Sequence, residues 1–242
     1  NASYSAALEN LPAFTNLKIL DLSYSQVTDV GYENIAALVN LEELDLRKTY
    51  VKDVALVHLE GLTRMKVLDL TETDIGDMGI QSLRELKNLE SLYPEKPRVN
   101  DQGLEYLAGL TNLSYLDLSG TKITDAGLVH LAGLKNLEHL DLKFTKITGT
   151  GLKNLTRLKN LETISLSKRE MTDEGLKYYT RLANLKEENG LYLFDSEITD
   201  EGLRHCKKAR ELDQLDLQGV RITGAGLKYF KRCKGLKVLN LK

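Results

Sequence analysis

The chain has 242 residues, and its 33 Lys and Arg residues against 35 Asp and Glu residues give a formal net charge of −2. This near balance lacks the positive surface that nucleic-acid-binding domains use, so we expect no nucleic-acid partner. No apolar run approaches the roughly 18 residues that are needed to span a bilayer, so we also expect no membrane span. The two cysteines are too few for a disulfide framework, which favours a reducing compartment such as the cytoplasm. A secreted effector stays open as an alternative.

The first residues read as the end of a truncated repeat unit. Leu8, Leu11 and Phe14 are spaced as one apolar helical stripe, and Asn16 closes the unit. Because the chain begins inside a unit, we expect the natural protein to continue before Asn1.

The remainder of the chain is a series of units of about 24 residues. Residues 1–16 are the truncated leading repeat, nine full repeats follow over residues 17–235, and residues 236–242 form a last strand. Stacked repeats share one core, and no single unit can bury its own apolar face. We therefore expect a single elongated domain over residues 1–242.

The unit at residues 113–136, LSYLDLSGTKITDAGLVHLAGLKN, shows the strand half clearly. Leu116 and Leu118 alternate with Tyr115 and Asp117. A period of two is typical of a short strand with one buried face and one solvated face. Tyr115 and Asp117 are therefore expected to point away from the core.

The second half of the same unit predicts a helix of about three turns, because Leu128, Leu131 and Leu134 recur every three residues. Before it, Thr124 and Asp125 form a helix-start signal, since a hydroxyl can cap free amides and a carboxylate suits the positive helix end. Asp recurs there in seven of nine units, and capping explains that column without a metal. Gly follows two residues later in eight units, which predicts close approach between neighbouring turns.

Two units depart from the pattern. Pro94 takes an inward position of its strand and cannot donate to a ladder, which predicts a broken or shortened strand there. The spacing from Met171 to Ile198 is 27 residues rather than 24, with three extra residues within 185–190. Tyr replaces the outward-facing Asp only in these two units. Such departures mark either function or drift in a degenerate array, and both interpretations stay open.

With its units in register, the chain resembles leucine-rich-repeat proteins over residues 8–242. Its Thr-Asp-x-Gly-Leu pattern is similar to that of bacterial members, and Cys233 near a helix end is similar to the ribonuclease-inhibitor-like repeats of F-box substrate receptors. The resemblance implies an α/β fold, a right-handed solenoid arc with a concave parallel sheet of about ten strands and convex helices. Strand spacing of about 4.8 Å against helix spacing of about 8–10 Å agrees with the sheet on the inner side.

The middle outward position of each strand forms a column across the expected sheet: Asp21, Asp45, Asp69, Tyr93, Asp117, Asp141, Ser165, Tyr192, Asp216 and Asn240. Adjacent carboxylates would repel each other by roughly 1 kcal/mol per pair. Arg47 and Lys143 can offset part of this repulsion. The column is either a family feature, hydrogen-bonded to nearby Ser and Thr, or an acidic strip that attracts a basic or amine-bearing partner.

Exposed aromatic side chains beside charges are typical of protein-binding hot spots. The expected partner-binding residues lie on the third to sixth strands and, as a second anchor, on the eighth: Asp69, Tyr93, Tyr115, Asp117, His139, Asp141 and Phe144, then Tyr192 and Phe194. Of these, Phe144 at the eighth position of its unit is expected nearest to the rim.

The sequence contains no recognisable catalytic, phosphate-binding or metal-binding motif. We therefore expect no enzyme activity, no metal and no cofactor. The favoured function is a monomeric protein-interaction scaffold that binds a protein or peptide on the concave sheet. One alternative is the substrate-recognition domain of a ubiquitin-ligase subunit or a bacterial effector. Another is recognition of a carbohydrate or other small polar ligand.

Overall fold

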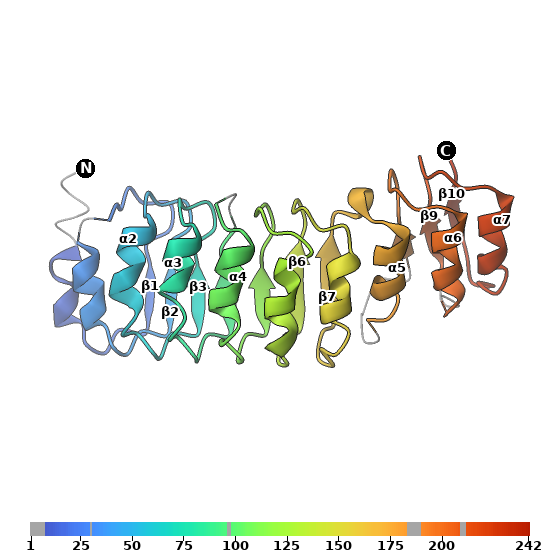
Figure 1. The fold of residues 1–242 in the computed structure, drawn as a ribbon. Helices are drawn as coiled ribbons and strands as arrows, with labels where there is room; N and C mark the ends of the chain where they lie inside the picture. Colours follow the sequence, from blue (N-terminus) through green and yellow to red (C-terminus); the bar gives the residue numbers. More distant parts are fainter. Residues whose placement is uncertain (1–7, 30, 96–97, 183–189, 209–211) are drawn as a thin grey trace.

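The computed structural model describes residues 8–29, 31–95, 98–182, 190–208 and 212–242. The molecule is an elongated row of repeats that runs from one terminus to the other without doubling back (Figure 1). Each repeat supplies a short strand and a helical segment, and the helical segments cover the same face of the strands. The opposite, uncovered face of the strands is called the sheet face below. The α/β solenoid expected from the sequence is confirmed.

Ten parallel strands form in the described part of the chain: β1 (Ile19–Asp21), β2 (Glu43–Asp45), β3 (Val67–Asp69), β4 (Ser91–Tyr93), β5 (Tyr115–Asp117), β6 (His139–Leu142), β7 (Thr163–Leu166), β8 (Gly190–Tyr192), β9 (Gln214–Asp216) and β10 (Val238–Asn240). Each strand pairs with the equivalent residues of its neighbour, as Leu116 does with Leu140. The pairing is not continuous, because β1 to β7 form one sheet and β8 to β10 form another. The expected strands are present, but the row is divided between β7 and β8.

The helical layer combines short α-helices with 3₁₀ segments. The α-helices are α2 (Asp53–Leu56), α3 (Asp77–Gln81), α4 (Asp101–Leu107), α5 (Asp173–Tyr179), α6 (Asp200–Leu203) and α7 (Gly224–Leu227). The 3₁₀ segments are η1 (Leu11–Ala13), η2 (Tyr32–Ala37), η3 (Val57–Leu59), η4 (Gly127–Gly133), η5 (Thr150–Asn154), η6 (Lys168–Glu170), η7 (Arg204–Lys208) and η8 (Lys228–Phe230). The expectation of helices about three turns long was wrong, because the longest described α-helices and 3₁₀ segments have seven residues. A 3₁₀ segment is thinner than an α-helix, which reduces the mismatch with the closely spaced strands. None of the described helices is long and apolar enough to cross a bilayer.

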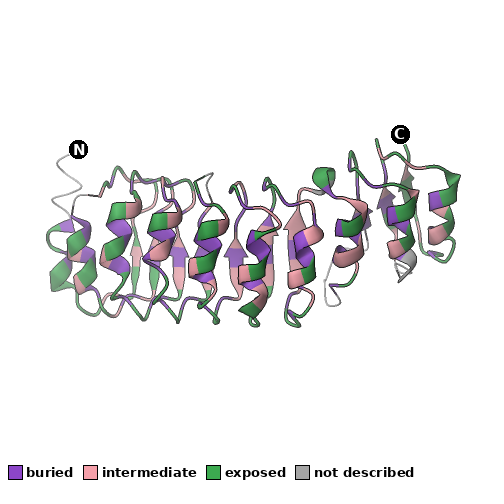
Figure 2. Cartoon of the chain, in the orientation of Figure 1, coloured by how far each residue is buried: buried purple, intermediate pink, exposed green. Residues whose placement is uncertain are grey.

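The core lies between the strands and the helical layer, where purple residues of neighbouring repeats line up in Figure 2. Leu116 and Leu118 of the strand and Leu128, Leu131 and Leu134 of the helical segment are all fully buried. These are the residues for which the two sequence periods predicted burial. Because each repeat contributes the same positions, the core is one continuous cluster along the described chain.

A column of hydroxyls closes the turn after the strands. Thr121 donates from Oγ1 to the Leu118 carbonyl at 2.6 Å, and both groups are buried. The same bond forms at Ser25, Thr49, Thr73 and Thr145. Ser196 occupies the equivalent position, but its buried hydroxyl has no hydrogen-bond partner. The column therefore satisfies backbone carbonyls that cannot reach water.

The Asp column joins neighbouring repeats. Asp125 accepts from the Thr148 backbone N–H at 2.9 Å, from its hydroxyl at 2.6 Å and from the Gly151 N–H at 2.6 Å. As the sequence predicts, the Asp residues that begin α-helices stand in the first turn of their own helix, but the amides and hydroxyls that they bond belong to the start of the next one. Capping within a helix is done instead by side chains such as Thr172, which accepts from the Gly175 N–H.

The Gly column follows from the Asp column. A Cβ atom on Gly79 would lie 2.8 Å from Oδ1 of Asp53 in the preceding repeat. On Gly127 it would collide with the Asp101 carboxylate and with Leu104. The close approach between turns that the glycines predicted is therefore present, and its cause is the bridging carboxylate.

Pro94 does not break its strand. β4 has three residues, as most of the other strands have, so the predicted interruption or shortening was wrong. The effect is confined to one neighbour, because β4 pairs with β5 at Ser91 and Leu92 but not at Tyr93. A proline lacks the N–H that would continue the ladder on that side. The predicted three-residue insertion lies outside the described residues apart from Gly190, and the division of the sheet falls in the same interval.

Candidate partner-binding surface

The outward carboxylates of the strands have one structural role in common. Asp69 Oδ1 accepts from the Thr71 backbone N–H at 2.9 Å, and Asp117 Oδ1 accepts from the Ser119 N–H at 2.8 Å. The same bond to the amide two residues later forms at Asp21, Asp45, Asp141 and Asp216. This Asx-type turn ends the strand and accounts for one carboxylate oxygen. The expected hydrogen bonds to nearby Ser and Thr residues are confirmed at Ser23, Thr71 and Ser119, whose backbone amides donate.

Cations neutralise only part of the acidic column. Arg47 contacts Asp45 at 2.7 Å and Asp69 at 3.3 Å, and Lys143 contacts Asp141 at 3.5 Å. Both cations were expected in this role. Asp117 forms no ion pair with any described residue, so a negative charge is left near the middle of the sheet face.

Three rings lie in a row over β4, β5 and β6. The Tyr93 and Tyr115 ring centroids are 4.9 Å apart with planes tilted by 33°, and those of Tyr115 and His139 are 5.8 Å apart with a tilt of 42°. His139 Nδ1 lies 2.7 Å from the Thr163 hydroxyl, which holds the imidazole in place. All three rings are partly exposed. The structure thus brings together the central residues that the sequence selected.

The surroundings of these rings are acidic and partly desolvated. Burial raises the pKa of Asp69, although the hydrogen bond from Thr71 opposes this. Burial and then the charges of Asp117 and other nearby carboxylates raise the pKa of Glu95. Burial, followed by Asp117, also raises the pKa of Tyr115. Burial disfavours a charge of either sign, but the part of the Glu95 and Tyr115 shifts that comes from neighbouring carboxylates reports a place where additional negative charge is unfavourable.

Glu95 is the functional candidate that sequence reasoning missed. It stands two residues after Tyr93, at the outward position that Ser119 and Lys143 occupy in later repeats, and that alternation was the available signal. We define the acid–aromatic patch by the residues gathered here: Asp69, Tyr93, Glu95, Tyr115, Asp117, His139 and Asp141.

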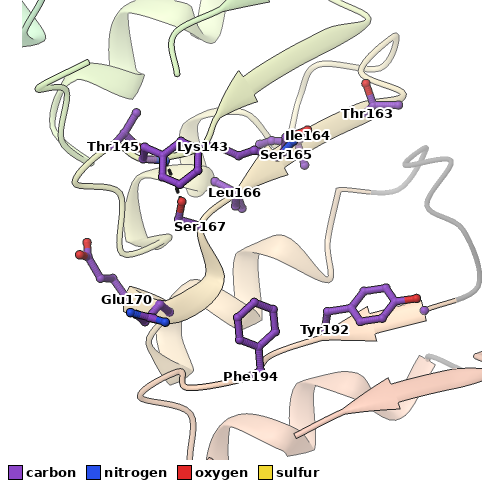
Figure 3. Close-up of a pocket in the computed structure, with 13 residues that line it drawn as sticks. Lys143, Thr145, Thr163, Ile164, Ser165, Leu166, Ser167, Glu170, Tyr192 and Phe194 are labelled. Atoms are coloured by element: carbon purple, nitrogen blue, oxygen red, sulfur yellow. Dashed lines mark hydrogen bonds between the residues drawn. The ribbon is translucent and has the colours of Figure 1, made fainter. Parts of the chain in front are cut away.

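Phe144, Tyr192 and Phe194 belong to a second place on the sheet face. They line a groove of about 1060 Å³ between β7 and β8 (Figure 3). The sequence interpretation placed Phe144 with the central residues, whereas the structure places it with Tyr192 and Phe194. Phe144 is also 79% exposed and has a left-handed backbone with φ of +57°. The candidate residues therefore divide between the acid–aromatic patch and this groove.

Among the described residues, no group of three or more His, Cys, Asp or Glu side chains is arranged to hold a metal ion. The aligned carboxylates of the Asp column are occupied by amides and hydroxyls of the next repeat, as Asp101 is by Thr124. The sheet face offers aromatic rings, carboxylates and exposed apolar surface.

Comparisons with known proteins agree with this architecture. A family model described as leucine-rich repeats in two copies matches residues 111–154, and a second leucine-rich-repeat model matches residues 15–36 and 62–83. No curated protein sequence matches the chain.

Two solved structures share the fold. The internalin C2 of Listeria monocytogenes superimposes with a TM-score of 0.59 and 20% identity, covering 98% of this chain and 92% of that one. The plant peptide hormone receptor RGFR1, in complex with RGF2, gives a TM-score of 0.60 and 16% identity, covering 96% of this chain and 45% of the receptor. At these identities the likeness concerns the fold alone. By its repeats, the family models that match parts of it and its solenoid fold, this chain is similar to leucine-rich-repeat proteins.

Proposed function

We propose that the protein is a non-catalytic, monomeric interaction scaffold, and that its acid–aromatic patch binds a basic side chain of a protein or peptide partner. The observation that carries the proposal is the row of Tyr93, Tyr115 and His139 beside Asp117. A Lys or Arg side chain is attracted both to the face of an aromatic ring and to a carboxylate, and partial desolvation strengthens both interactions. The fold itself needs neither tyrosine, because both point away from the core.

The open sheet face also suits a peptide or protein as the ligand, because the helical layer leaves it uncovered and its β7–β8 interval is hollowed into a groove. The peptide hormone receptor is similar in fold alone. Within the leucine-rich repeats we assign the chain to the 24-residue Thr-Asp-x-Gly-Leu subclass, because its bridging Asp and close-packed Gly are the two signature residues of that pattern.

The test is selection from a library of random 12-residue peptides, followed by measured affinities of the selected peptides. We expect enrichment of Lys and Arg. Tyr115→Ala and Asp117→Asn should each weaken binding by about tenfold, which corresponds to roughly 1.4 kcal/mol. Asp21→Asn is the matched control. It belongs to the same column and makes the same bond to an amide, but it lies at the N-terminal end of the sheet, away from the rings.

Failure to enrich Lys- and Arg-containing peptides, or equal losses from Asp117→Asn and Asp21→Asn, would contradict the proposal. A glycan-array signal that disappears in Tyr115→Ala would instead support the carbohydrate alternative. If a protein partner is captured, its identity decides whether the scaffold is the substrate-recognition domain of a ubiquitin-ligase subunit or of a bacterial effector.

A further inference from the structure

The sheet opens between β7 and β8 while the helical layer stays closed. Among the described residues, β7 pairs with β6 and β8 pairs with β9 but not with β7, whereas α5 still packs against α6. In Figure 1 the helices continue past this point and the strands separate into two groups. The opening is therefore confined to the sheet face, where it forms the groove.

The groove exposes side chains that other repeats bury. Leu142 on β6 and Leu118 are fully buried at the last inward position of their strands, while Leu166 at the equivalent position of β7 is partly exposed. Figure 3 shows Leu166 on the β7 side, with Tyr192 and Phe194 on the β8 side. Phe194 is 46% exposed even though it lines a concave site. The groove thus offers apolar surface on both sides.

The groove also lies between two strand edges. In the adjoining repeats the last inward residue donates its N–H to the next strand, as Leu118 does to the Asp141 carbonyl at 2.9 Å and Leu193 does to Asp216 at 2.8 Å. β7 and β8 share no ladder of this kind. An extended backbone placed between them can hydrogen-bond to an edge, which a compact ligand cannot do.

The size of the groove fits a short strand. A strand residue fills roughly 3.3 Å by 4.8 Å by 10 Å, or about 160 Å³, so a volume of about 1060 Å³ corresponds to roughly six to seven residues.

The charges at the lip of the groove favour an acidic ligand. Lys143 and Arg169 are 51% and 71% exposed, and each holds its carboxylate partner only at 3.5 Å. Such exposed ion pairs contribute little to the stability of the fold, so each cation can readily pair with another carboxylate. Glu170 is the one acidic residue among those lining the groove in the described chain. The groove is thus lined by more cationic than anionic side chains, whereas the acid–aromatic patch is mainly anionic.

We propose that the groove binds an extended segment of a partner protein, with alternating apolar and acidic residues, as an additional strand between β7 and β8. Apolar side chains of the segment cover Leu166 and contact Phe144 and Phe194, while its outward carboxylates meet Lys143 and Arg169. The proposal does not depend on the basic ligand assigned to the acid–aromatic patch.

The probe is a fluorescent, end-blocked hexapeptide with the sequence LEELDL, which copies residues 41–46 of this chain. Its inward leucines and outward acids match the two chemistries of the groove. We expect saturable binding and slower hydrogen exchange at the Leu166 amide. Binding should weaken by about tenfold or more in the double variant Phe144→Ala/Phe194→Ala and in Arg169→Glu. N-methylation of alternate peptide amides, or the charge-reversed sequence LKKLKL, should weaken it similarly.

Tyr24→Ala is the matched control, because Tyr24 is exposed and has the same left-handed backbone as Phe144 but lies at the other end of the sheet. It should leave binding of the hexapeptide unchanged, and so should Asp117→Asn, which separates this site from the acid–aromatic patch. The proposal is overturned if LEELDL does not bind saturably. It is also overturned if the N-methylated or charge-reversed peptide binds equally well, or if the Phe144/Phe194 double variant binds like the wild type.

Discussion

Asp101 accepts hydrogen bonds from the backbone N–H and the hydroxyl of Thr124 at 2.7 and 2.6 Å, so that a carboxylate of one repeat holds the helix start of the next. Asp101→Ala should lower the free energy of unfolding by about 1–3 kcal/mol, because a partly buried N–H loses a charged acceptor. Urea denaturation measures the change. Glu105→Ala, an exposed position on the same helix, is the control and should stay within about 0.5 kcal/mol of wild type. Equal effects of the two substitutions would show that the bridging carboxylates do not stabilise the stack.

The hydroxyl column gives a pair of substitutions with opposite expectations. Thr121→Val removes a buried hydrogen bond to the Leu118 carbonyl and should lower the free energy of unfolding by about 1–2 kcal/mol. Ser196→Ala removes a buried hydroxyl that has no partner, so it should be neutral or stabilising. Thermal unfolding of both variants tests the contrast. A larger loss for Ser196→Ala than for Thr121→Val would be inconsistent with it.

Phe144 combines an exposed ring with a left-handed backbone, a conformation that Gly120 and Gly219 adopt at the same position of other repeats. The left-handed region disfavours a bulky residue by roughly 1–2 kcal/mol, a penalty that glycine avoids. Glycine also makes the unfolded chain more flexible, which cancels part of this gain in stability. Phe144→Gly should therefore raise the free energy of unfolding by about 0.5–1 kcal/mol. A loss of stability would mean that the ring packs against the fold. If Phe144→Gly keeps its stability but no longer binds the hexapeptide, the ring serves binding.

Binding of a basic ligand should depend on pH. Burial raises the pKa of Asp69, and burial and neighbouring carboxylates raise that of Glu95. These groups take up protons at a higher pH than they would in the unfolded chain, so their ionised forms destabilise the fold near neutral pH and acidification relieves the penalty. A cationic ligand needs the ionised forms, so its affinity should fall on acidification, beginning at a higher pH than for an ordinary carboxyl group. Titration calorimetry over a series of decreasing pH values measures the loss, which should shrink in Glu95→Gln. An affinity independent of pH would exclude these carboxylates from the site.

Much of the architecture could be predicted from the sequence because the repeat applies one rule many times. The spacing that predicts burial of Leu116 and Leu131 recurs in nearly every unit, so an irregularity in one unit does not change the prediction. The predictions that were wrong concern contacts between neighbouring repeats. Nothing within one unit says whether Asp125 reaches its own helix or the next, since both arrangements place a carboxylate near free amides.

The candidate site was predictable only in part. Tyr115 and His139 are outward residues of neighbouring strands, so alternation alone brings them together. Phe144 was assigned to the wrong group because its position follows the strand, where a left-handed residue redirects the side chain and alternation no longer applies. The groove itself could not be derived, because it arises from the separation of two strands and not from any residue type.

The bridging carboxylates link adjacent repeats, from Asp29 to Lys52 at one end to Asp200 to Thr223 at the other. Removing or duplicating one whole unit would therefore leave each of these acceptors facing an equivalent amide. A protein fastened in this way is free to change its length in steps of one repeat, and with it the number of side chains that it presents to a partner.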